Sequence, residues 1–98
     1  MIPFRFAPAA QSELLHEVDY YSVVRPGAGI RFQAAVEQMV SRARSHPLGG
    51  APSFSKTRSM LVKGFPFNVI YLVEGGTLVV VAIAPHRKRP LYWAARLG

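Results

Sequence analysis

The sequence predicts an α+β fold in which a two-helix hairpin packs on one face of a small, mostly antiparallel sheet of about four strands. Two amphipathic stretches between residues 8 and 45 are separated by a Pro-Gly turn, β-prone segments follow residue 57, and Gly75-Gly76 joins the last two of these. A chain of 98 residues is long enough for one hydrophobic core. We therefore expect a single domain over residues 1–98, with the order β-α-α-β-β-β and a basic tail.

The N-terminal part is predicted to form a short strand and a helix. Residues 2–7 alternate and are β-prone, and Pro8 suits the first turn of a helix, where its missing N–H is not needed. From residue 8 to about 24, apolar side chains recur at spacings of three and four, at Ala10, Leu14, Val18 and Tyr21. Glu13 and Glu17 lie off that stripe, so we expect them on a solvated face.

A second helix is predicted from about residue 28 to 45. Its apolar face carries Phe32, Val36, Met39, Val40 and Ala43. The segment Arg25-Pro26-Gly27 ends the first helix, and His46-Pro47 ends the second. Because the connection is short, the two helices should form an antiparallel hairpin.

The C-terminal half is predicted to supply most of the sheet. Residues 47–57 are rich in Pro, Gly and Ser and should form an irregular loop, whereas residues 58–62, 67–74 and 77–84 are β-prone. Gly75-Gly76 suits a two-residue hairpin turn that places Glu74 opposite Thr77. Counting back from this turn predicts the pairs Tyr71 with Val80, Val69 with Ala82, and Phe67 with Ala84.

The two faces of this hairpin are expected to differ. The face that the helices should cover carries Phe67, Val69, Tyr71, Val73, Leu78, Val80, Ala82 and Ala84. The other face is apolar in its middle, with Ile70, Leu72, Val79, Val81 and Ile83, and polar at its ends. An exposed apolar patch of this kind usually marks a binding surface, so we expect it to face a partner protein.

Composition narrows the class of function. The chain has 12 basic and 5 acidic residues, a formal charge of +7, and residues 50–98 hold seven cations against Glu74 alone, a net charge of +6. This asymmetry favours an acidic partner or a nucleic acid. Cysteine is absent, which excludes disulfides and thiol chemistry, and we expect no cofactor. The chain starts without the apolar core of a signal peptide and has no membrane-spanning apolar run, so we expect a cytoplasmic protein.

Reactive and charged side chains are concentrated directly after the last predicted strand. The apolar run 78–84 leads into Pro85, followed by His86, Arg87, Lys88, Arg89, Pro90, Leu91, Tyr92 and Trp93. A strand end holds such groups steadily, and an imidazole, three cations and a phenol suit a polyanion better than a core. The other two histidines, His16 and His46, have no cluster of potential ligands around them, so a metal site is not expected.

The chain resembles the RelE/ParE superfamily of toxins from bacterial type II toxin–antitoxin modules over essentially its whole length. The resemblance lies in the turn from Pro26 to Phe32, in Gly64-Phe65-Pro66-Phe67-Asn68-Val69-Ile70-Tyr71, and in His86-Arg87-Lys88-Arg89-Pro90-Leu91-Tyr92-Trp93. It implies a compact toxin held inactive by a cognate antitoxin, and an acidic antitoxin suits the basic half of this chain. RelE-like members cleave mRNA on the ribosome without a metal, whereas ParE-like members inhibit DNA gyrase by binding.

The resemblance implies different roles for the same residues. For mRNA cleavage, His86 would be the base and Tyr92 the acid or a stacking group, because the reaction needs both. Cations would bind phosphate or a protein partner, and the candidates are Arg87, Lys88, Arg89, Lys56, Arg58 and Lys63. Alternatively, His86 is a rim residue, Tyr92 only docks the tail, and the cations are solvated.

Ribosome-dependent mRNA cleavage by a metal-independent endoribonuclease is the first hypothesis, and departures from the RelE-like pattern weaken it. RelE-like nucleases tend to have an arginine where this chain has Asn68, and lysines where it has Ser59 and Leu61. A ParE-like gyrase inhibitor without its own catalysis is therefore a second hypothesis. A basic adaptor that has lost toxicity is a third.

Overall fold

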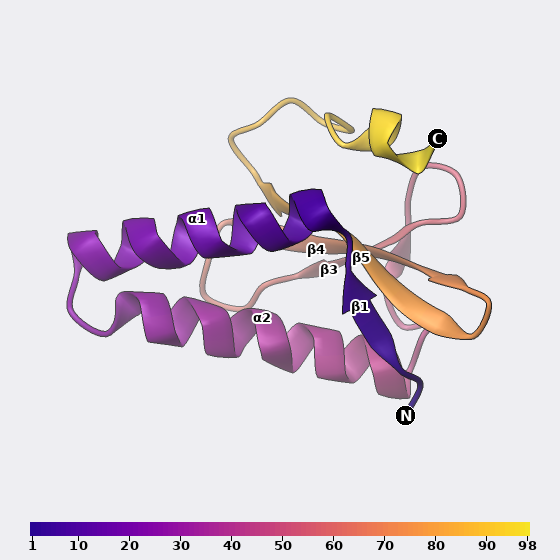
Figure 1. Cartoon of the computed structure of the whole chain (residues 1–98), viewed down its shortest axis with the longest axis horizontal. Helices are drawn as coiled ribbons and strands as arrows, with labels where there is room; N and C mark the ends of the chain where they lie inside the picture. The colour runs from indigo at the N-terminus through magenta and orange to yellow at the C-terminus, as the bar shows by residue number, and fades with distance from the viewer.

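A computed structural model describes the whole chain, residues 1–98, and places two antiparallel helices against a five-stranded sheet (Figure 1). The elements in chain order are β1 (Phe4–Phe6), α1 (Pro8–Val24), α2 (Ala28–Ser45), β2 (Ala51–Pro52), β3 (Arg58–Leu61), β4 (Phe67–Glu74), β5 (Thr77–Pro85) and a short 3₁₀ helix (Ala94–Leu97). The α+β class and the helical hairpin on one face of the sheet are confirmed. No helix is both long enough and apolar enough to cross a lipid bilayer.

The helical hairpin follows the predicted bounds because its turn and its helix contact are both specified locally. Gly27 adopts φ +79°, a left-handed conformation that side chains disfavour, and the chain reverses there. At the contact between the two helices, a Cβ on Gly29 would lie 2.6 Å from the backbone oxygen of Val18 and nearer still to Ser22 Oγ. Only glycine permits this spacing, so Gly29 sets the distance between α1 and α2.

The sheet has the order β1-β5-β4-β3-β2, in which β1 is parallel to β5 and the other neighbours are antiparallel. The additional strand is β2, which lies within the segment predicted to be an irregular loop and pairs Ala51 with Ser59. Hydrogen bonds of Tyr71 on β4 and Arg58 on β3 hold this segment against the sheet. Tyr71 Oη accepts from Gly50 N (3.0 Å) and donates to the Pro47 carbonyl (2.8 Å), and Arg58 donates to the carbonyls of Leu48 and Gly50.

A β-bulge shifts the register between β4 and β5. Glu74 pairs with Thr77 and Tyr71 with Val80, as predicted, but the next pair is Ile70 with Ala82. The predicted pairs of Val69 with Ala82 and Phe67 with Ala84 are wrong by one residue, because Val69 pairs with Ile83 and Phe67 with Pro85. Val81 is the extra residue, and beyond it the side chains of β5 point to the opposite faces from those predicted.

The main core lies between the helical hairpin and the sheet. It contains the predicted apolar faces of both helices together with Phe67, Val69, Tyr71, Leu78, Val80 and Ile83. Ile83 is fully buried in this core, so its predicted place on the open face is wrong, and the bulge at Val81 is the cause. The same shift moves Ala82 out of this core, and Val73, near the hairpin turn, is exposed.

A second, smaller core covers the sheet face opposite the helices. After β5 the chain turns back (Figure 1). Trp93 packs on this face with Ile70, Val81 and Ala82, and Leu72 and Tyr92 lie at the margin. Ile70, Val79 and Val81 are each buried. The expected open face is therefore wrong for this part of the sheet, because the chain's own C-terminal segment covers it.

Candidate functional site

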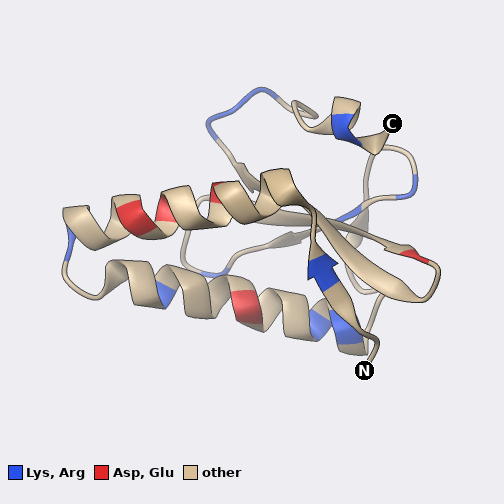
Figure 2. Cartoon of the chain, viewed as in Figure 1, with Lys and Arg blue, Asp and Glu red and all other residues tan.

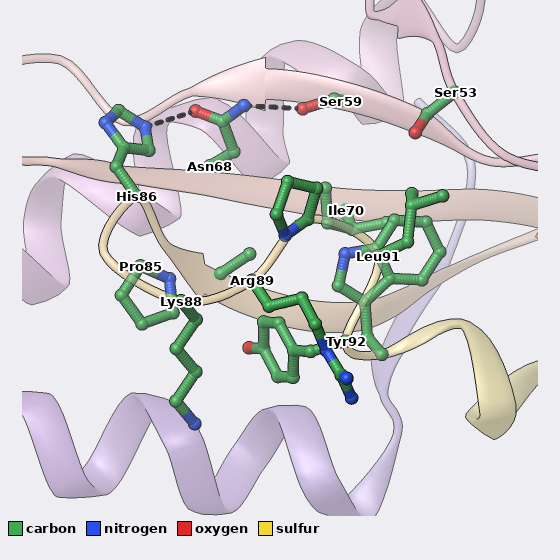
Figure 3. Close-up of a pocket in the computed structure, with 13 residues that line it drawn as sticks. Ser53, Ser59, Asn68, Ile70, Pro85, His86, Lys88, Arg89, Leu91 and Tyr92 are labelled. Carbon is green, nitrogen blue, oxygen red and sulfur yellow. Dashed lines mark hydrogen bonds between the residues drawn. The ribbon is translucent and has the colours of Figure 1, made fainter.

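An open cleft with a volume of about 370 Å³ lies between the C-terminal segment and the sheet (Figure 3). Its polar lining comes from β3, β4 and the loop after β2 on one side, and from the segment after β5 on the other. The residues with polar side chains are Ser53, Ser59, Asn68, His86, Lys88, Arg89 and Tyr92. Four of the predicted catalytic and cation-binding residues, His86, Lys88, Arg89 and Tyr92, therefore line one cleft, together with Ile70, which was expected to face the antitoxin.

A chain of hydrogen bonds fixes His86 at one end of this cleft (Figure 3). His86 Nε2 lies 2.9 Å from Asn68 Oδ1, and Asn68 Nδ2 donates to Ser59 Oγ at 2.8 Å. With the amide oxygen as acceptor, Nε2 carries the proton and Nδ1 is the free ring nitrogen. The backbone N–H of His86 also donates to the Pro66 carbonyl at 2.9 Å. Asn68 thus positions the imidazole.

The three cations after His86 have different surroundings, although all are exposed. Arg87 Nη2 lies 3.7 Å from a carboxylate oxygen of the buried Glu17. Lys88 Nζ lies 4.7 Å from the centre of the Tyr92 ring, which is within cation–π range. Arg89 lines the cleft without an ion pair or a side-chain hydrogen bond inside the protein. Of the three, Arg89 is the freest to bind an external anion.

A carboxylate on α1 anchors the C-terminal segment. Glu13 Oε2 accepts from Tyr92 Oη at 2.6 Å and from Arg96 Nη2 at 2.8 Å, while Oε1 accepts from Arg96 Nη1 at 2.9 Å and from the Ile83 N–H at 3.1 Å. Arg96 Nη1 also donates to the Val81 carbonyl, at the bulge. One side chain therefore joins α1, β5 and the tail. We call the Glu13–Tyr92–Arg96 arrangement the Glu13 clasp.

The Glu13 clasp perturbs the titration of all three of its members. Partial burial acts to raise the pKa of Glu13, but hydrogen bonds from Arg96, Tyr92 and the Ile83 N–H, and the charge of Arg96, outweigh it, so the pKa lies below its ordinary value. Burial raises the pKa of Tyr92, and the hydrogen bond to Glu13 and its negative charge raise it further. The hydrogen bond and charge of Glu13 likewise raise the pKa of Arg96, against the effect of burial.

These contacts correct the expectation for the two glutamates of α1. Both were expected on a solvated face, but Glu17 is 6% exposed and Glu13 is held by the clasp. The reason is that the C-terminal segment lies along α1, which the helical pattern alone does not predict. No group of three or more His, Cys, Asp or Glu side chains is placed to hold a metal ion.

The remaining predicted cations do not join the cleft. Arg58 is on the helix side of the sheet, where it pairs with Tyr71 and ties down the loop before β2. Lys56 precedes β3 and Lys63 follows it, so the length of a strand separates the two. Arg96 lies against the cleft residue Tyr92, and both bind Glu13 in the clasp. Positive charge is thus spread over several elements, whereas the acids lie mostly on the helices (Figure 2).

Sequence reasoning missed Ser59 as a positioning residue and both Glu13 and Arg96 as clasp residues. The role of Ser59 depends on the register between β3 and β4, which pairs Ser59 with Ile70 and brings its hydroxyl to Asn68, and the sequence analysis predicted no register for these two strands. No signal existed for Glu13 either, because its partners lie 70 to 83 residues away in the chain.

The helical hairpin, the five-stranded sheet and the basic segment that closes over it define a small domain of the RelE/ParE superfamily of toxins. The chain belongs to the ParE toxin family of type II toxin–antitoxin systems, since the model of that family, described as the ParE toxin of the parDE system, matches residues 4–90. A solved structure of the chromosomal ParDE system from P. aeruginosa is similar in fold, with a TM-score of 0.68 and 21% identity over 87% of this chain and 96% of that chain. A search among curated proteins finds no match.

Proposed function

We propose that this chain is the growth-arresting toxin of a cytoplasmic type II toxin–antitoxin pair, and that it acts by binding and inhibiting DNA gyrase without catalysis of its own. A cognate acidic antitoxin would neutralise it. The observation that supports this choice over mRNA cleavage is the Glu13 clasp, because it removes Tyr92 from the set of available proton donors.

Cleavage of RNA through its 2′-hydroxyl needs a base, an acid and cations around one phosphate. In the cleft, His86 would be the base and Arg89 one of the cations. The hydroxyl group of Tyr92 donates a hydrogen bond to Glu13 at 2.6 Å, and the raised pKa of Tyr92 makes it a poor acid at neutral pH. Lys56, Arg58 and Lys63 line no part of the cleft. Because the candidate acid, Tyr92, is held by Glu13, the cleft suits binding better than cleavage.

Ribosome-dependent mRNA cleavage is the second candidate, because His86 keeps a free ring nitrogen and lines the same cleft as the unpaired Arg89. In that reaction His86 would be the base, and Arg89 would hold the phosphate. Lys88 or a group of the ribosome would then have to take the place of the acid.

Induction of the protein in bacterial cells, followed by primer extension on cellular transcripts, separates the two candidates. The gyrase proposal predicts growth arrest with intact transcripts, and the His86→Ala variant should arrest growth as well as the wild type. Transcripts cut at defined positions, and intact in cells that express His86→Ala, would contradict it. A folded wild type that leaves growth unchanged would instead indicate an adaptor that has lost toxicity.

Co-expression with the product of a neighbouring short acidic reading frame tests the antitoxin part of the proposal. Growth should recover, and the two proteins should copurify as a complex. Continued arrest with no complex would contradict the pairing. Ile70 and Val81, expected to face the antitoxin, pack with Trp93 of the chain's own tail, and Val79 is buried as well, so a different surface is needed for that contact.

A further inference from the structure

The cleft between the C-terminal segment and the sheet is lined by hydrogen-bond donors and cations but by no acid. None of the chain's five aspartate and glutamate residues is among the 13 residues that line it. Glu13, which binds the lining residue Tyr92, also accepts two hydrogen bonds from Arg96, so the clasp compensates its charge. An anion that enters the cleft therefore meets no repulsion from the lining.

Serine hydroxyl groups lie on the strand side of the cleft, across from Arg89 (Figure 3). Ser59 Oγ accepts the hydrogen bond from Asn68 Nδ2 at 2.8 Å, so its own hydrogen remains available to donate. Ser53 lies on the same side and lines the cleft with a second hydroxyl group. This side of the cleft can therefore donate hydrogen bonds to an anion.

The opposite side of the cleft supplies positive charge. Arg89 lines it without an ion pair inside the protein, and Lys88 lines it as well. A guanidinium group can bind a phosphate through two parallel hydrogen bonds. The oxygens of a phosphate group are arranged tetrahedrally, so they can accept from both sides of the cleft at once, whereas the two oxygens of a carboxylate lie in one plane. The two-sided lining therefore suits a phosphate group better than a carboxylate.

The cleft offers no free aromatic face on which a nucleobase could stack. The centre of the Tyr92 ring lies 4.7 Å from Lys88 Nζ and 5.3 Å from Arg96 Cζ, so two cations already lie against this ring. Trp93 is only 3% exposed. Because stacking on aromatic side chains is what holds bases in single-strand binding proteins, a nucleic acid in this cleft would be held by its backbone. We therefore expect little preference for the base.

The size of the cleft limits the form of the nucleic acid. Its volume of about 370 Å³ is at the lower end of the range for ligand pockets, which is about 300–1,000 Å³. It has room for part of one strand, whereas a duplex would have to stay outside. A single strand can also continue beyond an open cleft, where a neighbouring phosphate would meet the exposed side chain of Arg87.

We propose that the cleft binds the phosphodiester backbone of an unpaired DNA strand. One phosphate would lie between Arg89 and the hydroxyl group of Ser59, and the adjoining sugar would rest against the apolar lining at Pro90 and Leu91. The inference deepens the proposed function and rests on it only for the source of the strand, which would be the DNA that gyrase holds. The toxin would then contact both the enzyme and its DNA.

The test measures binding of labelled oligonucleotides of about ten nucleotides to the full-length protein by fluorescence anisotropy. Single-stranded oligothymidine and oligodeoxyadenosine should bind within about threefold of each other, and oligouridine RNA should bind no more tightly, because a backbone phosphate site needs neither a particular base nor a 2′-hydroxyl group. The logarithm of the association constant should fall with the logarithm of salt concentration, with a slope of roughly −0.7 for each phosphate bound. Backbone amide shifts of the isotope-labelled protein should centre on residues 59, 68 and 86–91.

Matched variants check the site. Arg89→Ala should weaken oligothymidine binding about tenfold and Ser59→Ala about fivefold. The controls are Arg42→Ala and Ser45→Ala, at exposed residues of α2 outside the cleft, and both should bind as the wild type does. Since Arg42→Ala removes the same charge as Arg89→Ala, an equal loss in the two would mean that only the total charge matters, and would overturn the proposal.

Other ligands decide between the possible occupants of the cleft. Thymidine monophosphate that binds as tightly as the strand would make a free nucleotide the ligand. A glutamate peptide of the same length that competes as well as unlabelled oligothymidine would make an acidic protein segment the ligand. RNA that binds more than about tenfold more tightly than DNA would point to recognition of the 2′-hydroxyl group. Each of these results, or the absence of DNA binding, would overturn the proposal.

Failure of this inference can be told apart from failure of the proposed function. A chain that inhibits supercoiling by gyrase but binds no oligonucleotide loses the DNA site and keeps the proposed function. A chain that binds oligothymidine in the cleft but leaves supercoiling and growth unchanged does the reverse.

Discussion

Replacement of Glu13 by glutamine is expected to release the C-terminal segment from α1. The side chain keeps its size but loses its charge. In the wild type, Glu13 accepts hydrogen bonds from Tyr92, from both terminal nitrogens of Arg96 and from the Ile83 N–H, so the NH₂ group of the glutamine would face donors. A hydrogen bond to a charged group contributes about 1.5–3 kcal/mol. The side chains of Glu13 and Arg96 are 17% and 27% exposed, so water compensates for part of the loss.

We therefore expect Glu13→Gln to lower the free energy of unfolding by about 2 kcal/mol, which corresponds to a fall in Tm of about 10 °C for a domain of this size. Urea unfolding and thermal melts followed by circular dichroism provide the measurement, with tryptophan fluorescence as a local probe, because Trp93 packs in the second core. The matched control is Glu37→Gln, at an exposed residue of α2.

The effect of Glu13→Gln should also depend on pH. The folded-state pKa of Glu13 is lowered, so its carboxylate contributes stability that is fully present above the unfolded-state pKa of about 4.3. That contribution is lost as the pH falls through the lowered folded-state value. The difference between wild type and variant should therefore shrink below about pH 4. A melt within about 1 °C of wild type at pH 7, or a difference that persists unchanged in acid, would refute this reasoning.

Three further substitutions test other contacts. Tyr71→Phe removes the two hydrogen bonds that hold the loop at Pro47 and Gly50, and should lower the free energy of unfolding in urea by about 2 kcal/mol. The control Tyr20→Phe, at an exposed ring, should change it very little, and equal effects of the two substitutions would contradict the assigned role of Tyr71. Gly29→Ala should destabilise the protein by about 2–3 kcal/mol, because the new methyl group meets the Val18 carbonyl. An unchanged Tm would contradict the role of Gly29 in setting the distance between α1 and α2. Arg89→Ala should weaken growth arrest without a change in Tm, and full arrest by this folded variant would remove Arg89 from the binding surface.

The helical hairpin was predictable because its signals are local. Apolar spacing placed both helices, and Pro26-Gly27 placed the turn between them, so the predicted bounds of α2 agree with the structure. The hairpin of β4 and β5 was predictable near Gly75-Gly76 for the same reason. The register failed beyond Val80, because residues 78–84 are all apolar and no polar residue marks which side chains face water. The bulge at Val81 therefore left no signal in the sequence.

The candidate site was predictable only in part. The run of His86, Arg87, Lys88 and Arg89 after an apolar strand indicated a basic binding surface, and His86, Lys88 and Arg89 do line one cleft. The state of Tyr92 was not predictable, since it depends on a carboxylate 79 residues away on α1. The open face of the sheet was predicted wrongly because Trp93 comes after the last strand, and the sequence does not indicate on which surface such a tail packs.

The most direct test of the central claim is a gyrase supercoiling assay with relaxed plasmid, ATP and increasing amounts of the purified chain. We expect supercoiling to fall as the protein is added, equally for wild type and His86→Ala, because the proposed action is binding and not proton transfer. Arg89→Ala should need a higher concentration for the same effect. Supercoiling that continues unchanged at a large excess of folded protein, while the same preparation arrests growth in cells, would contradict the claim.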